Sequence, residues 1–273
     1  MTIDDLELEY SAAEIREFIE TAVARKGTQH RPRFYAVTGS HVYGFDSADS
    51  DIDVRGIHVA PAAEYAYLET PAEEVTVNMD GVTEGFEEYP EVDLRSYELR
   101  KFGSLLAKAN YNVVELVFEA PTVMNGMPLE MDALQELIRD YLPMNVPHAY
   151  LGMAKSNYYK HLDPEKEQGY TPVAKNFLYV YRGLLGAQYV LDDEDIEADV
   201  FALAEAVDGG NPELVADLVA HKRTAGDEIL SDDLESRARD AITQQFNALD
   251  PLPEPDKSGY REALDDWMRK VRT

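Results

Sequence analysis

Two aspartates, Asp51 and Asp53, are the residues whose type and spacing most clearly indicate chemistry. They stand two positions apart in a β-prone stretch, and on a strand that spacing directs both carboxylates to the same face of the sheet. Ile52 and Val54 alternate with them and can face the core. Two carboxylates held close together repel each other unless a cation lies between them. Because Mg²⁺ prefers oxygen ligands and keeps positions open for water and phosphate oxygens, the pair predicts a divalent metal site.

A glycine-serine turn precedes this pair and supplies a complementary site for an anion. A β-prone run at 33–38 leads into Gly39 and Ser40. Gly39 lets the backbone approach an anion closely, and Ser40 can donate to a phosphate oxygen. Free N–H groups after Ser40 would point at the same anion, and Gly44 allows a second tight passage of backbone. Together the turn and the carboxylates are what a metal–nucleoside triphosphate requires.

The order of these residues resembles the signature of the DNA polymerase β-like nucleotidyltransferase superfamily. That signature is Gly-Ser, a further glycine, then Ser-Asp-x-Asp, and here it is carried by residues 39–53. A D-x-D pair alone is common on solvated strands, whereas this combination in this order is much rarer. The longer pattern is similar to the branch described as RNA-ligase-associated predicted nucleotidyltransferases. The further similar stretches are Ser50–Gly56, Pro61–Tyr65, Asp93–Phe102, Asn110–Glu119 and, more weakly, Lys175–Leu185.

The resemblance covers roughly residues 34 to 191 and implies an α+β fold. The expected architecture is a polymerase-β palm-like mixed sheet with helices, followed by an all-α helical bundle. One departure is Tyr111, where family patterns often have proline; it affects a turn rather than the chemistry. The implied reaction moves an NMP from an NTP to an acceptor hydroxyl, an RNA terminus, and releases pyrophosphate.

Asp93 is the expected third carboxylate of the site. A third acid on an adjacent strand would complete the metal set, so that Asp51, Asp53 and Asp93 hold two Mg²⁺ or Mn²⁺ ions and act as the catalytic residues. The third acid would also accept the proton of the attacking hydroxyl. The alternatives are that Asp93 only marks a turn before a helix, or that Glu91 takes its place.

The expected nucleotide contacts come from two parts of the chain. Gly39 and Ser40 would cradle the β- and γ-phosphates, and Arg55 would either support the carboxylate strand or bind phosphate. Cations and aromatic residues gather between residues 154 and 185, in a chain that is otherwise acidic. Lys175 and Arg182 are the cations expected to reach the triphosphate. The alternative is that the aromatic side chains form a core and the cations cover it with their aliphatic stems. The full expected set is Gly39, Ser40, Gly44, Arg55, Lys175 and Arg182.

Composition limits the class of protein. The 273 residues are 45% hydrophobic, which excludes a mostly disordered chain, and the absence of cysteine excludes disulfides and thiol nucleophiles. The net charge of −28 is interpreted as halophilic adaptation of the whole surface. At molar salt the Debye length is only ~3 Å, so this acidity neither proves nor excludes a polynucleotide acceptor.

Location, partners and competing functions follow from other sequence features. No apolar run approaches membrane-spanning length and the chain starts with acidic residues, so a soluble cytoplasmic protein with no membrane partner is expected. The acceptor could also be a protein hydroxyl, as in antitoxin-type adenylyl transfer, or a small metabolite. A non-catalytic nucleotide-binding or antitoxin-type module is a second class of function. The P-loop motif is missing, which argues against a P-loop NTPase, and the oligomeric state stays open.

Apolar periodicity predicts the elements that would position these residues. Extended stretches are expected at 74–77 and 86–89, and a strand at 92–95 ends at Ser96, the expected N-cap of a helix. A boundary at Gly126–Pro128 divides the chain into a catalytic domain, 1–125, and a helical accessory domain, 126–273. The expected helices are Ser11–Lys26, Tyr97–Ala109, Asn112–Glu119, Met131–Leu142, Ala149–His161, Pro172–Leu191, Ile196–Val207, Pro212–Thr224, Asp232–Asn247 and Tyr260–Val271.

Overall fold

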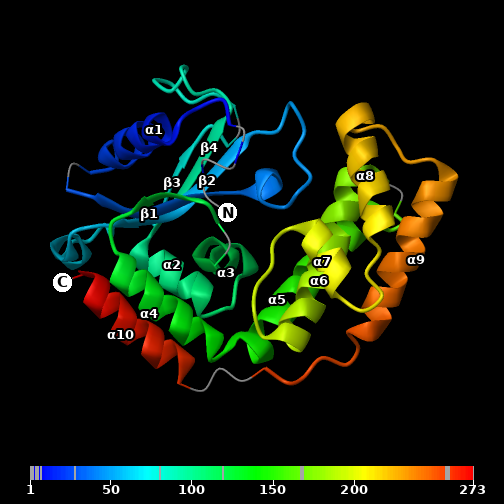
Figure 1. Ribbon diagram of the computed structural model, residues 1–273. Helices are drawn as coiled ribbons and strands as arrows, with labels where there is room; N and C mark the ends of the chain where they lie inside the picture. Colours follow the sequence, from blue (N-terminus) through cyan, green and yellow to red (C-terminus); the bar gives the residue numbers. More distant parts are fainter. Residues whose placement is uncertain are drawn as a thin grey trace. The chain divides into compact units, whose positions relative to one another are not determined.

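A computed structural model of the chain describes residues 3, 6, 8–27, 29–79, 81–118, 120–166, 169–255 and 259–272, without the side chains of 142–144. Within these ranges the fold is α+β, with one five-stranded mixed sheet and ten α-helices (Figure 1). This confirms the predicted fold class.

The chain divides into two compact units. The first unit holds Met1–Val42, Asp49–Ile138 and Ser258–Thr273, and the second holds Tyr43–Ala48 and Arg139–Lys257. These units do not coincide with a division after residue 125, because the C-terminal segment belongs with the sheet and the short segment 43–48 belongs with the later helices.

The sheet of the first unit has the strand order β3-β4-β2-β1-β5. Its central strands β2 and β4 are parallel, and all other neighbours in the sheet are antiparallel. The strands are β1 (Arg31–Thr38), β2 (Ile52–Val59), β3 (Glu74–Val77), β4 (Val92–Glu98) and β5 (Thr122–Asn125).

Alternation of apolar and polar residues explains the two central strands. On β2, Ile52 and Val54 are buried while Asp53 is half-buried, and on β4 Val92 and Leu94 are buried beside a half-buried Asp93. Side chains on a strand point alternately to opposite faces, so each strand carries its polar residues on the face opposite these apolar ones.

Helix α1 (Ala12–Ala24) begins at a capping box, in which Ser11 accepts from the Glu14 backbone N–H and the Glu14 side chain accepts from Ser11. Figure 1 shows α1 on one side of the sheet, and α2 (Leu99–Leu106), α3 (Tyr111–Phe118), α4 (Pro128–Arg139) and α10 (Tyr260–Arg272) on the other. The predicted helix 112–119 corresponds to α3, and its last residue, Glu119, lies outside the described residues.

The C-terminal helix α10 packs against α2 and α4. Phe102 and Trp267 have ring centroids 6.2 Å apart, and the Trp267 indole N–H donates to the Glu130 carbonyl at 2.6 Å. A Cβ on Gly103 would lie 2.4 Å from the Met268 sulfur, so glycine permits this close approach of the two helices. These contacts explain why α10 belongs to the sheet unit.

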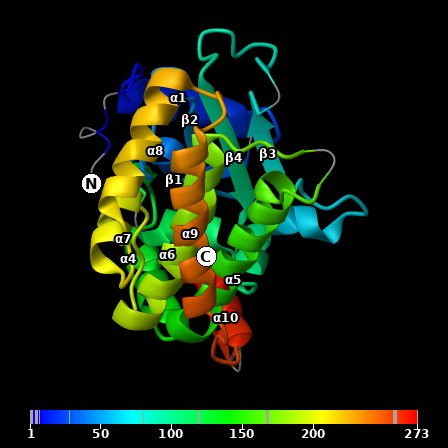
Figure 2. The same cartoon turned by 90° about the vertical axis from the view of Figure 1, so that its right-hand side faces the viewer.

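The second unit is helical in its described residues. Helix α6 is its centre, with most of its length buried, and in both views it lies among the neighbouring helices (Figures 1 and 2). The elements are α5 (Leu142–Asn157), which continues into the π-helical turn η4 (Tyr158–Leu162), then α6 (Ala174–Asp193), α7 (Val200–Ala206), α8 (Pro212–Ala225) and α9 (Asp232–Ala248).

Two local predictions differ from the structure, and one strand was missed. Ser96 is not an N-cap: it lies inside β4, buried, within 2.5 Å of the Tyr35 hydroxyl and 2.8 Å of His58 Nδ1, and Glu98 caps α2 instead. The stretch 86–89 forms turns rather than a strand, with Phe86 packed on Phe18 at 5.1 Å. Strand β5 was not expected, because its four residues show little alternation on their own.

Among the described residues, no helix is both long enough and apolar enough to cross a membrane.

Candidate metal and nucleotide site

Asp53 on β2 and Asp93 on β4 are partners in the parallel register of the two central strands. Residues paired in this way present their side chains on the same face of the sheet, so both carboxylates share one face. Asp51 precedes β2 by one residue and is exposed. The register therefore places Asp93 on the same face as Asp53, whereas Asp51 lies outside the paired residues, and its part in the site stays a prediction.

The Gly39 turn lies directly against the Asp53 carboxylate. Gly39 has φ +77°, and a Cβ at this position would lie 2.1 Å from Asp53 Oδ2. Both its backbone conformation and the lack of space require glycine here. Gly39, Ser40 and His41 form the short 3₁₀ turn η2 (Gly39–His41), directly after β1. Thr38, the residue before the turn, pairs with Asp53 in the β1–β2 register.

Two arginines lie next to the aspartates on the same face of the sheet. Arg55 follows Asp53 by two residues and Arg95 follows Asp93 by two, and the two arginines are again register partners. Arg55 Nη2 lies 3.9 Å from Asp53 Oδ1, a long ion pair between partly buried groups. Arg95 was not recognised from the sequence, although the repeat of Asp-x-Arg on the two strands is a signal that could have found it.

Glu91, the alternative to Asp93, stands outside β4 and is fully exposed. A hydrogen bond with Glu9 and its charge raise the pKa of the Glu91 carboxyl, with a smaller effect from Asp51. Glu91 is therefore close enough to sense Asp51 electrostatically, while the strand register associates Asp93 with Asp53.

The donor chemistry of this region suits a hard divalent cation, because it consists of carboxylate oxygens beside a glycine turn. In the part of the chain that the structure describes, no group of three or more Asp, Glu or His side chains is gathered closely enough to hold a metal ion. The register brings together two carboxylates, Asp53 and Asp93, with Gly39 against the first of them.

The other expected nucleotide contacts belong to the second compact unit. Lys175 is exposed in the first turn of α6. Arg182 is only 1% exposed, and its guanidinium carbon lies 3.6 Å from the centre of the Tyr43 ring. Gly44 has φ +80°, and a Cβ there would lie 2.3 Å from Asp199 Oδ2. Within this unit Gly44 and Arg182 therefore take part in the packing of the segment 43–48.

The same segment is bound by two further cations of its own unit. The Lys222 ammonium donates to the Ser47 hydroxyl at 2.8 Å, and Arg223 Nη2 lies 3.1 Å from Asp46 Oδ1. The sequence did not indicate that Lys222 and Arg223 contact this segment, because they lie some 175 residues further along the chain.

The mixed sheet with paired carboxylates on its parallel central strands and a glycine turn beside them is the arrangement of a polymerase-β-type nucleotidyltransferase. Comparison with known families agrees: residues 14–270 match the family described as "RlaP: RNA repair pathway DNA polymerase beta family". The chain belongs to this family, which confirms the resemblance inferred from the sequence and indicates a nucleotidyltransferase-type enzyme.

A curated relative is the protein named "Uncharacterized protein YcgL" of Bacillus subtilis (strain 168). It is 27% identical to this chain over 206 residues, which is 74% of this chain and 73% of the relative.

Proposed function

We propose that this protein transfers a nucleoside monophosphate from an NTP to an acceptor hydroxyl, with release of pyrophosphate, and that the acceptor is an RNA terminus. The observation that carries the proposal is the register pairing of Asp53 with Asp93 beside the Gly39 turn. The family description, which names an RNA repair pathway, supports RNA as the acceptor class.

Asp51, Asp53 and Asp93 are the residues that would hold Mg²⁺ or Mn²⁺. A divalent pair supplies Lewis-acid stabilisation of the oxygens that attack and leave in such a transfer. The carboxylates themselves orient the acceptor hydroxyl, and Asp93 is suited to accept its proton. Phosphoryl transfer depends mainly on positioning and on stabilisation of charge, so these roles need no covalent intermediate on the protein.

The residues around the carboxylates would bind the triphosphate. Gly39 allows backbone to approach phosphate oxygens without a side chain in the way, and Ser40 can donate to one of them. Arg55 and Arg95 place two guanidinium groups on the same face as the aspartates, where they suit phosphate oxygens bidentately. Lys175 belongs to the second unit, where its side chain is exposed in the first turn of α6, and its contact with a nucleotide stays a prediction. For Arg182, burial under Tyr43 favours a supporting role.

Release of pyrophosphate tests the proposal. The purified protein is incubated with each NTP, Mg²⁺ or Mn²⁺ and a single-stranded RNA, from low to molar KCl, and both pyrophosphate and labelled RNA are measured. We expect metal-dependent release that matches transfer of label to the RNA end. If pyrophosphate is released but the labelled nucleotide is found on protein or on a small molecule, the reaction is as proposed and the acceptor is not RNA.

Two outcomes would contradict the proposed reaction. Tight NTP binding by calorimetry without any pyrophosphate release would indicate a nucleotide-binding module. Equal release by wild type and by the Asp53→Asn variant would show that the reaction takes place elsewhere or comes from a contaminant.

A further inference from the structure

A groove lined by arginines lies beyond the C-terminal ends of β2 and β4, in the first unit. It consists of two adjoining cavities of about 470 and 410 Å³, which share Ala62 and Arg272 in their walls. The short 3₁₀ helix η3 (Ala62–Ala66), the start of α2 and the end of α10 form its sides. Asp53 and Val59 stand six residues apart on β2, about 20 Å at the rise of a strand, so the groove is separate from the aspartates.

The charge of this groove contrasts with the rest of the chain. Four arginines line the two cavities, and Asp265 is the acidic residue among their described walls. The whole chain has 53 acidic and 25 basic residues, so an average surface of this protein would show the opposite balance. The four arginines are Arg31, Arg100, Arg269 and Arg272.

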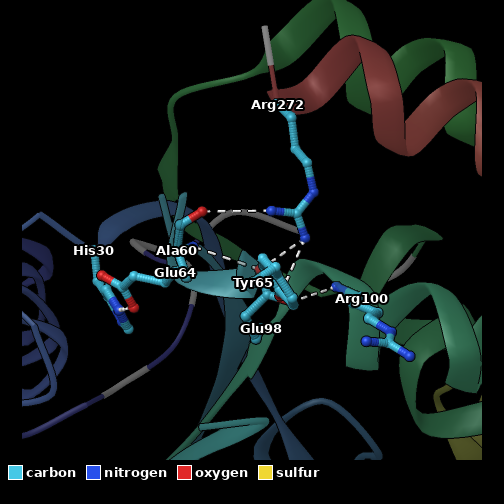
Figure 3. Close-up of polar contacts among 7 residues, drawn as sticks. All are labelled: His30, Ala60, Glu64, Tyr65, Glu98, Arg100 and Arg272. Atoms are coloured by element: carbon cyan, nitrogen blue, oxygen red, sulfur yellow. Dashed lines mark hydrogen bonds and ion pairs between the residues drawn. The ribbon is translucent and has the colours of Figure 1, made fainter. Parts of the chain in front are cut away.

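Arg272 is held in place by the floor of the groove. Its guanidinium donates to Glu98 Oε1 at 3.0 Å, to the Tyr65 hydroxyl at 3.2 Å and to the Ala60 carbonyl at 3.4 Å (Figure 3). Glu98 is 1% exposed, and its other oxygen accepts from the Arg100 backbone N–H at 2.6 Å. The carboxylate below is therefore satisfied by these donors, and Arg272 is fixed in orientation.

The remaining arginines are available at the surface of the groove. Arg31 and Arg100 are exposed, and within the described residues neither guanidinium makes an ion pair. Arg269 pairs with Asp266, but both side chains are mostly exposed, and such a pair costs little to exchange for another anion. Three cations can thus turn toward a ligand while the fourth stays anchored.

We propose that this groove binds the phosphodiester backbone of a single-stranded nucleic acid. The arginines are distributed along two joined cavities rather than directed at one point, which suits a series of phosphates better than one compact anion. Arginine matches phosphate geometry bidentately. Tyr67 and Leu68, which follow η3, are 70% and fully exposed, and the tyrosine ring offers a surface on which a base can stack. Binding of a strand is argued from the groove itself. That the bound strand is also the acceptor rests on the proposed function.

Binding without NTP tests this groove independently of catalysis. Fluorescence anisotropy is measured with a labelled 20-nucleotide RNA and with DNA of the same sequence, at a series of KCl concentrations. The double variant Arg31→Gln/Arg100→Gln should bind at least about tenfold more weakly than wild type. The slope of log affinity against log salt should become shallower by about 1.4, since each contact to a single strand contributes about 0.7.

A matched control is Arg237→Gln/Arg223→Gln, which removes two exposed arginines of the second unit and should leave both quantities close to wild type. Circular dichroism checks that each variant is folded. Comparison of the RNA and DNA arms identifies which strand the groove prefers.

Three results would contradict the proposal that this groove binds a single-stranded nucleic acid. One is equal affinity of wild type and the Arg31/Arg100 variant for both strands. Another is a loss in the control pair as large as in the groove pair. The third is binding of AMP or inorganic phosphate that depends on Arg100 while neither oligonucleotide binds, which would indicate a compact phosphate site. Binding is measured without NTP or metal and transfer with both, so failure of transfer and failure of strand binding give different results.

Discussion

Asp53 and Asp93 occupy matching positions on two parallel strands, and the residue two positions beyond each of them is an arginine. Parallel register keeps side chains of equal position on the same face, so two short Asp-x-Arg repeats, 40 residues apart in sequence, become one charged patch. The patch has carboxylates at one end, which suit metal cations, and guanidinium groups at the other, which suit phosphate anions.

Removal of either paired carboxylate should strongly slow nucleotide transfer. Asp53→Asn and Asp93→Asn each keep the size of the side chain but remove a negative charge, and loss of about 3 kcal/mol of transition-state stabilisation corresponds to roughly 100-fold in rate. Metal-dependent pyrophosphate release is the measurement. Glu91→Gln is the matched control and should retain activity; if it behaves like Asp93→Asn, the third acid has been assigned to the wrong residue.

Arg55 and Arg95 should both contribute to NTP binding. Arg95→Gln and Arg55→Gln remove one guanidinium each, and the loss of a charge-assisted hydrogen bond to phosphate, about 1.5–3 kcal/mol, predicts a roughly 10- to 100-fold weaker NTP affinity. Calorimetry with a non-hydrolysable NTP measures this. Arg100→Gln, at the start of α2 beyond the C-terminal end of β4, serves as control. Unchanged affinity in both Arg55 and Arg95 variants would indicate that they only support the strands.

Substitution of Gly39 should damage both the turn and the Asp53 carboxylate. In Gly39→Ala the new Cβ would lie 2.1 Å from Asp53 Oδ2, at a φ of +77° that costs about 1–2 kcal/mol for alanine. We expect a lower urea midpoint and loss of pyrophosphate release. Gly152→Ala is the control, because a Cβ there meets nothing within 4 Å and helix α5 gains propensity. Full activity of Gly39→Ala would contradict the close contact.

The sequence predicted the fold class, most helices and the residues of the D-x-D strand, because these depend on local periodicity and on short motifs. It misjudged Ser96, since a serine before a helical pattern is locally a good N-cap. Only the tertiary structure reveals the buried partners, Tyr35 and His58, that hold Ser96 in the strand. The return of α10 to the sheet unit depends on contacts such as Trp267 with Glu130, 137 residues apart, which no local pattern contains.

Stability should fall at mildly acidic pH because of His58. Burial, helped by the neighbouring His30 charge and opposed by Glu98, lowers the pKa of His58 to about 4 from 6.5. The folded state therefore binds fewer protons than the unfolded state between these values. The free energy of unfolding is highest above pH 6.5 and decreases as pH falls toward 4, by up to about 3 kcal/mol from this group.

Urea unfolding of wild type and His58→Gln between pH 7.5 and 4 measures this contribution as the difference between the two slopes. Carboxylates that do not interact with His58 contribute equally to both proteins and cancel in the difference. Parallel curves for wild type and His58→Gln would show that His58 is not buried in its neutral form.

The ion pair between Glu98 and Arg272 should couple the last turn of α10 to the end of β4. The Glu98 side chain is 2% exposed and that of Arg272 is 24% exposed, so Arg272→Gln removes a charged hydrogen-bond donor from a buried carboxylate, at a cost of about 1–3 kcal/mol. Glu98→Gln/Arg272→Gln should recover part of this loss, because two amides can hydrogen bond without a buried charge. Urea unfolding of wild type, Glu98→Gln, Arg272→Gln and the double variant gives the coupling energy between the two residues.

The control is Arg269→Gln, which breaks an exposed ion pair and should change the free energy of unfolding by less than about 0.5 kcal/mol. Strictly additive effects at Glu98 and Arg272 would mean that α10 is not tied to the sheet through this contact.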